Sequence, residues 1–109
     1  MLDSMGVAKV IVVDEVKMDA AVGIVVRPRI APGEGYEFIY RMASGVRWNP
    51  ERRAFVVFEP KEMSAAWWFR QIVTAVQSEY GHRLELRQET RWTDIPQEVR
   101  LEMESEHAV

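Results

Sequence analysis

The residues that could carry catalysis or bind a metal are few and scattered along the chain. The two histidines, His82 and His107, lie far apart in the sequence, and neither has a second ligand at a metal-binding spacing. Asp14 and Glu15 are neighbours, so an extended backbone would point them to opposite faces, which is unsuited to shared acid–base work. The chain has no cysteine, which excludes disulfides, thiolate metal sites and cysteine nucleophiles.

We therefore expect no catalytic group, metal or cofactor, and an enzyme ranks last among the functional classes. The sequence Gly-Glu-Gly at residues 33–35 lacks the lysine and the strand-to-helix placement of a phosphate-binding loop. His82 lies just beyond the expected helix, where a structural role is the better interpretation.

A long helix is expected over residues 60–80, and the rest of the chain is arranged around it. Pro60 suits the first helical position, and Gly81 suits the left-handed residue that follows the last turn. At about 100° per residue, one face of this helix is apolar and would pack on a sheet. That face carries Ala65, Ala66, Phe69, Ile72, Val73, Val76 and Tyr80.

The opposite helix face is nearly uncharged, although solvated helix faces usually carry lysine and glutamate four residues apart. It comprises Met63, Trp67, Gln71, Thr74 and Ser78, with Trp68 and Ala75 on the flank. A tryptophan left in water forgoes roughly 2–3 kcal/mol of burial. Either the C-terminal segment of the same chain covers Trp67, or Met63, Trp67, Gln71 and Thr74 form a contact surface for a second copy or another partner.

The sequence predicts a single α+β domain over residues 1–109, with the element order ββββαβ. Strands are expected at residues 7–13, 20–30, 36–43, 54–59 and 82–90. Short links between the first four favour antiparallel pairing, with the helix packed on one face of the sheet. Residues 95–104 fit a short helix or a strand, and the helix is favoured because Asp94 can cap it. The tail from about residue 104 is expected to be loose.

Composition is that of an ordinary globular protein. The 109 residues are 48% hydrophobic and 28% charged, with a formal net charge of −3, so the molecule as a whole is not built to attract polyanions. No apolar run approaches the roughly 20 residues of a membrane span, and the N-terminus is a poor signal peptide. We expect a cytoplasmic protein.

Arginines and aromatic residues alternate between residues 27 and 53, a pattern that can hold phosphates and stack bases. The arginines are Arg27, Arg29, Arg41, Arg47, Arg52 and Arg53. They fall on several expected elements, and strand aromatics more often belong to a core. Nucleic-acid binding is therefore the weaker alternative.

Residues 46–57 read Val-Arg-Trp-Asn-Pro-Glu-Arg-Arg-Ala-Phe-Val-Val, an aromatic residue and an Asn-Pro turn followed by a strand. This sequence pattern resembles one found in several unrelated α+β domains and does not indicate an activity. Taken whole, the short cysteine-free chain is similar to the hypothetical proteins carried on integron gene cassettes. That resemblance implies no site and no function.

Two functional hypotheses follow from the tryptophans. The first is a small non-catalytic interaction protein that forms a homodimer through the helix face of Met63, Trp67, Gln71 and Thr74. The second is a module that binds a small amphipathic or aromatic ligand, with Trp48, Trp67, Trp68 or Trp92 as walls of the pocket.

Overall fold

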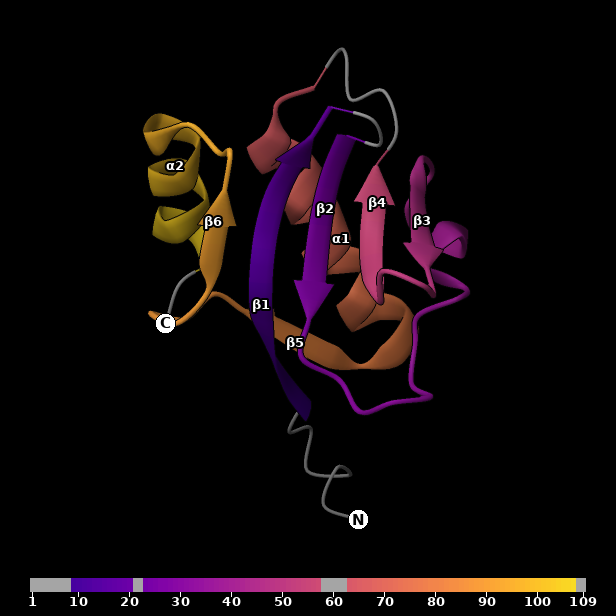
Figure 1. The fold of residues 1–109 in the computed structure, drawn as a ribbon. Coiled ribbons are helices and arrows are strands. Elements are labelled where there is room, and N and C mark those ends of the chain that lie inside the picture. Colours follow the sequence, from indigo (N-terminus) through magenta and orange to yellow (C-terminus); the bar gives the residue numbers. More distant parts are fainter. Residues whose placement is uncertain (1–8, 21–22, 58–62, 108–109) are drawn as a thin grey trace.

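A mixed β-sheet with a long helix across one of its faces makes up the computed structural model, which describes residues 9–20, 23–57 and 63–107 (Figure 1). Among those residues the sheet has the strands β1 (Lys9–Asp19), β2 (Gly23–Pro28), β3 (Val46–Asn49), β4 (Ala54–Val57), β5 (His82–Glu85) and β6 (Arg91–Thr93). The helices are the short 3₁₀ helix η2 (Ile39–Arg41), α1 (Ala65–Tyr80) and α2 (Gln97–His107). The expected α+β class is confirmed.

The strand order is β3-β4-β2-β1-β5, and β6 also pairs with β1. Pairs β1–β2, β2–β4 and β3–β4 are antiparallel. Short links join β1 to β2 and β3 to β4, as in hairpins, whereas β2 and β4 are neighbours in the sheet but not in the sequence. Both β5 and β6 run parallel to β1, because α1 carries the chain back across the sheet before β5 begins. The sheet is therefore mainly antiparallel, with a parallel edge that the sequence pattern did not predict.

Helix α1 ends where the sequence predicted but begins later. Gly81 adopts a φ of 70°, the left-handed conformation expected after the last turn. At the start, the Ser64 hydroxyl accepts a hydrogen bond from the Trp67 N–H at 3.1 Å, so that Ser64 is the N-cap. The expected start at Pro60 lies outside the described residues, and the described helix begins at Ala65.

The buried side of α1 is wider than the predicted stripe. Trp68 and Ala75, which the sequence placed on the flank of the exposed face, both pack against the core. The reason is the position of the segment before β3. A Cβ atom at Gly45 would lie 3.0 Å from the Trp68 ring, so this part of the chain lies against that flank of the helix. The core between α1 and the sheet includes Val13, Val16, Ile24, Val26, Phe55, Val57, Phe69, Ile72 and Val76.

The prediction of a strand over residues 36–43 is wrong, because η2 and turns occupy that stretch. Ile39 and Ala43 reach the core, and their four-residue spacing is that of a helical turn. The strand lies in the next stretch, where Trp48 and Val46 of β3 face the core. The predicted turn at Asn49 is confirmed, since its side-chain oxygen accepts hydrogen bonds from the N–H groups of Glu51 and Arg52, both at 3.0 Å.

The C-terminal segment forms α2, which confirms the favoured helical interpretation of residues 95–104. Met103 is fully buried, and Ile95 and Val99 pack against the same core. The helix continues to His107, past the point where a loose tail was expected. Two contacts hold this end on α1: the His107 ring lies 5.0 Å from that of Phe69, and Arg70 bonds to Glu106 at 2.7 Å.

Burial of Met103 predicts that α2 contributes to global stability. Met103→Ala should lower the free energy of unfolding by about 2–5 kcal/mol, because it leaves a cavity in the core. Leu101→Ala is the matched control: this side chain is 54% exposed, so the change should stay within about 0.5 kcal/mol. Urea unfolding of both variants measures the difference, and equal effects would contradict the packing of α2.

Candidate interaction surface and pockets

The outer face of α1 consists of Met63, Trp67, Gln71, Thr74 and Ser78. Thr74 and Ser78 are exposed, Met63 is 40% exposed, and Trp67 and Gln71 are partly buried. The ring of Trp67 meets that of Trp68 edge to face, with centroids 4.9 Å apart. The Trp67 indole therefore packs against the Trp68 ring and is not part of the core.

Helix α2 contacts α1 at the exposed Arg70, beside this outer face, and at Phe69, which lies in the core. Arg70 forms a two-pronged ion pair with Glu106, which lowers the pKa of that carboxyl and raises that of the guanidinium. The charge of Arg70 is thus matched by Glu106. The C-terminal segment was one of the two expected covers for Trp67, and its described contacts with α1 fall on this flank.

Beside α1, the residues in and next to η2 present exposed apolar side chains that the sequence interpretation missed. Phe38, Tyr40 and Met42 are 46%, 48% and 51% exposed. The segment is fastened to α1, since the Phe38 N–H donates to the Tyr80 hydroxyl at 2.9 Å and Arg41 pairs with Glu79 at 3.7 Å. Arg41 also lies over the Phe38 ring, 4.3 Å from its centroid. The four-residue spacing of Ile39 and Ala43 is the signal that could have revealed this arrangement.

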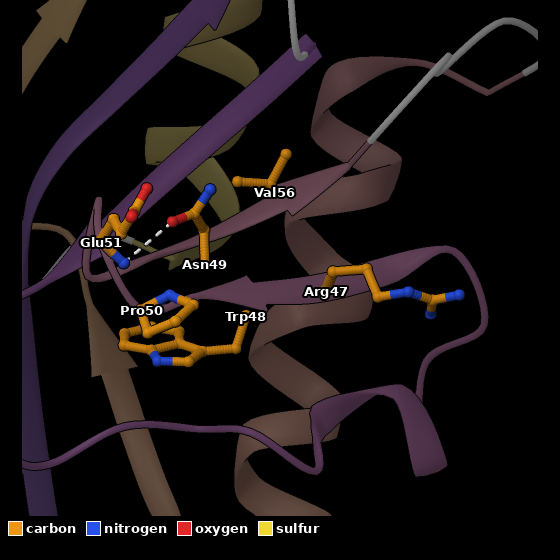
Figure 2. Close-up of a pocket in the computed structure, with 6 residues that line it drawn as sticks. All are labelled: Arg47, Trp48, Asn49, Pro50, Glu51 and Val56. Carbon is orange, nitrogen blue, oxygen red and sulfur yellow. Dashed lines mark hydrogen bonds between the residues drawn. The ribbon is translucent and has the colours of Figure 1, made fainter.

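A pocket of about 350 Å³ lies at the turn between β3 and β4 (Figure 2). Trp48 forms a wall and the buried Val56 an apolar floor. Arg47 and Glu51 lie at opposite ends of the lining, which also includes Asn49 and Pro50. The pocket therefore combines an apolar base with polar ends.

The four tryptophans do not meet in one pocket. Trp48 lines the pocket beside β3, Trp67 and Trp68 lie on α1, and Trp92 lies on β6 beyond β1. Arg100 of α2 covers the Trp92 ring, 5.2 Å from its centroid. Of the expected tryptophan walls, Trp48 is the one that lines this pocket.

Most of the arginines between residues 27 and 53 are bonded to the protein itself. Arg27, Arg29, Arg41 and Arg52 pair with Glu15, Asp14, Glu79 and Asp19, and Arg53 donates to the carbonyl of Ile30. Arg47 alone of the six has no hydrogen bond or ion pair within the described ranges. These arginines do not form one free basic surface.

His82 has the structural partner that its position suggested. Its Nδ1 atom shares a hydrogen bond with the Tyr36 hydroxyl at 2.9 Å. Burial, and then the nearby Lys9, lower the pKa of His82, while burial and the Glu34 carboxylate raise the pKa of Tyr36 to about 12. Both groups are therefore neutral near pH 7. In residues 9–20, 23–57 and 63–107 no group of three or more acidic or histidine side chains could hold a metal.

These features define a small α+β protein with surface pockets and a nearly uncharged outer helix face. In the described part of the chain, none of its helices is long and apolar enough to cross a membrane. The profile of the integron cassette protein Hfx_Cass5 family matches residues 9–90. The chain belongs to this family, as its resemblance to cassette proteins indicated.

A solved structure from the mobile metagenome of the North West Arm Sewage Outfall, integron cassette protein Hfx_Cass5, is 36% identical in sequence. The match covers 85% of this chain and 90% of the other, with a TM-score of 0.40. None of the curated proteins compared with the chain matches it.

Stability should depend on pH through the histidines. Burial lowers the pKa of both His82 and His107, so the unfolded chain binds protons more readily than the folded one. The free energy of unfolding should therefore be highest above the unfolded pKa of about 6.5 and fall as the pH drops below it. The hydrogen bond from Thr93 is the main cause that lowers the pKa of Glu15. The free energy of unfolding should therefore fall further at more acidic pH, where this carboxyl becomes protonated.

Urea unfolding at pH 7.5 and at about pH 5.5 tests this expectation. His82→Gln and His107→Gln should each make the loss of stability smaller, because each removes one group that binds a proton on unfolding. A free energy of unfolding that stays constant across this interval would contradict it.

Proposed function

We propose that this protein is a non-catalytic interaction protein that forms a homodimer through the outer face of α1. The observation that supports it most is the composition of that face: Met63 and Trp67 stand among neutral polar residues, without a lysine or glutamate. Methionine and tryptophan are enriched in interface cores, and neutral side chains cost less to desolvate than charges. The expected cytoplasmic location stays part of this proposal.

Size and symmetry are compatible with a dimer. A helix of 16 residues is about 24 Å long, enough to cross its own copy around a two-fold axis. A stable interface buries about 800 Å² on each partner. Phe38, Tyr40 and Met42, in and next to η2, are also exposed, and Arg41 ties this segment to Glu79 of α1. They would add apolar area to the interface if the partner also covered this segment.

Trp67→Glu should convert the dimer into a monomer, because a carboxylate at the centre of the interface would be desolvated without a partner. Size-exclusion chromatography with light scattering measures the mass of both proteins. Since Trp67 also contacts Trp68, Thr74→Arg provides a second variant at an exposed position of the same face.

Leu101→Glu is the matched control, because Leu101 is apolar and 54% exposed but lies on α2. It should leave the dimer intact, and far-UV circular dichroism should show that all three variants are folded. A wild-type chain that remains monomeric at high concentration, or a dimer that survives both α1 substitutions, would contradict the proposal.

A second candidate function is the binding of a small amphipathic ligand in the pocket beside Trp48. The observation in its favour is Arg47, which has no partner in the described residues and borders the apolar floor formed by Val56. An aromatic carboxylate would place its ring on Val56 and Trp48 and its charge on the guanidinium.

Titration with 3-phenylpropionate, followed by tryptophan fluorescence, tests this candidate. Arg47→Gln should weaken binding about five-fold, the effect of an exposed ion pair of about 1 kcal/mol. Arg91→Gln is the control, because its side chain is 68% exposed and lies on β6. The absence of a saturable response, or equal binding by Arg47→Gln, would exclude a ligand of this class.

Nucleic-acid binding remains the weakest proposal. Four of the six arginines that would carry it already pair with carboxylates of the same chain, so binding phosphates would require breaking those pairs. A strong dependence of any observed binding on salt would be its signature.

A further inference from the structure

A second pocket, of about 310 Å³, lies where the chain leaves β2 and passes the start of β5. Its lining includes Ile30, Glu34, Gly35, Tyr36, Glu37 and His82. None of these residues belongs to the proposed dimer surface or to the pocket between β3 and β4, which we call the pocket of Arg47. The feature that sets it apart is that polar groups approach one point of the backbone without bonding to each other.

That point is Gly35. A Cβ atom at this position would lie 2.7 Å from Nε1 of Trp48 and 2.9 Å from Oε2 of Glu37, so only glycine leaves room for both groups. The indole N–H is a donor and the carboxylate an acceptor. Within the described chain neither one has a hydrogen-bond partner, and Glu37 has no ion pair.

The remaining polar groups of the pocket are occupied. Oε1 of Glu34 accepts from the Ala31 N–H at 3.0 Å, and its Oε2 lies 3.8 Å from Lys9. Tyr36 and His82 hold each other through their 2.9 Å hydrogen bond, which leaves the second ring nitrogen of His82 available. The charge of Glu34 is thus offset by Lys9, and Glu37 is the one lining residue whose charge is not matched within the described residues.

We propose that this pocket binds a small alkylammonium group, with Glu37 as the carboxylate that receives it. An ammonium carries three donors and no acceptor, and Glu37 offers the free carboxylate oxygens that it requires. The neutral His82 ring supplies a second acceptor in the tautomer that carries its proton on Nδ1, and Ile30 contacts the alkyl chain. An anion of the same size would instead meet the unmatched carboxylate.

The test compares three probes of equal chain length: n-butylammonium, n-butyrate and 1-butanol. Each is titrated into ¹⁵N-labelled protein while the amide of Gly35 and the indole N–H of Trp48 are followed by NMR. Butylammonium should cause saturable shifts with a dissociation constant on the order of 1–10 mM, as expected for so few atoms. Butyrate and butanol should cause no saturable shift at these two resonances.

Glu37→Gln keeps the shape of the exposed side chain and removes its charge, so it should weaken butylammonium binding about five-fold. Glu51→Gln is the matched control: it is also exposed and without an ion pair in the described chain, but it lines the pocket of Arg47, and binding should not change. Equal binding of butyrate, no effect of Glu37→Gln, or no saturable response would overturn the proposal. The Trp67→Glu variant should bind as the wild type does, which separates this result from the dimer.

Discussion

The pairing of one edge of β1 with two separate strands holds residues 82–107 in place. β5 pairs with the first part of β1 and β6 with a later part. Between them, the hydroxyl of the buried Thr90 donates to the carbonyl of Val13 at 2.6 Å, next to the irregularity in the β1–β2 register. This bond satisfies the carbonyl of Val13, a residue that pairs with neither β5 nor β6. α2 follows β6 directly, so its position depends on the same edge.

The two surfaces of the domain differ in how their charges are arranged. On the face of the sheet away from α1, Glu15 accepts hydrogen bonds from Arg27 and Thr93. On the same face, Asp19 forms ion pairs with Lys17 and Arg52. These pairs lie over a small apolar cluster of Val25, Ala54 and Val56 on that side of the sheet. The outer face of α1 carries no such network. A partner that covered α1 would therefore displace water from neutral groups, whereas a partner on the sheet would have to break ion pairs.

Local sequence patterns correctly predicted the two α-helices, because each helix carries a clear signal in or beside its own residues. The apolar stripe and Gly81 placed α1, and Asp94 as a candidate cap favoured a helix over residues 95–104. Residues 36–43 were misread as a strand because the apolar side chains Phe38, Tyr40 and Met42 alternate like those of a strand while facing solvent. Non-local contacts decided the outcome, since Trp48 and Tyr36 pack edge to face at 5.4 Å. The pockets depend on such contacts, so their residues could not be grouped from sequence.

Trp48 connects the fold with both pockets. Its ring packs on Phe55 and Tyr36 in the core, one side lines the pocket of Arg47, and its nitrogen approaches Gly35 in the other. A substitution at Trp48 would therefore change the stability of the protein and the shape of both pockets together. Its effect on ligand binding could not be attributed to one pocket. Arg47 and Glu37 do not have this double role, because both are exposed and carry unmatched charges of opposite sign. Opposite charges on the two sides of one indole would give the two proposed binding pockets opposite ligand preferences.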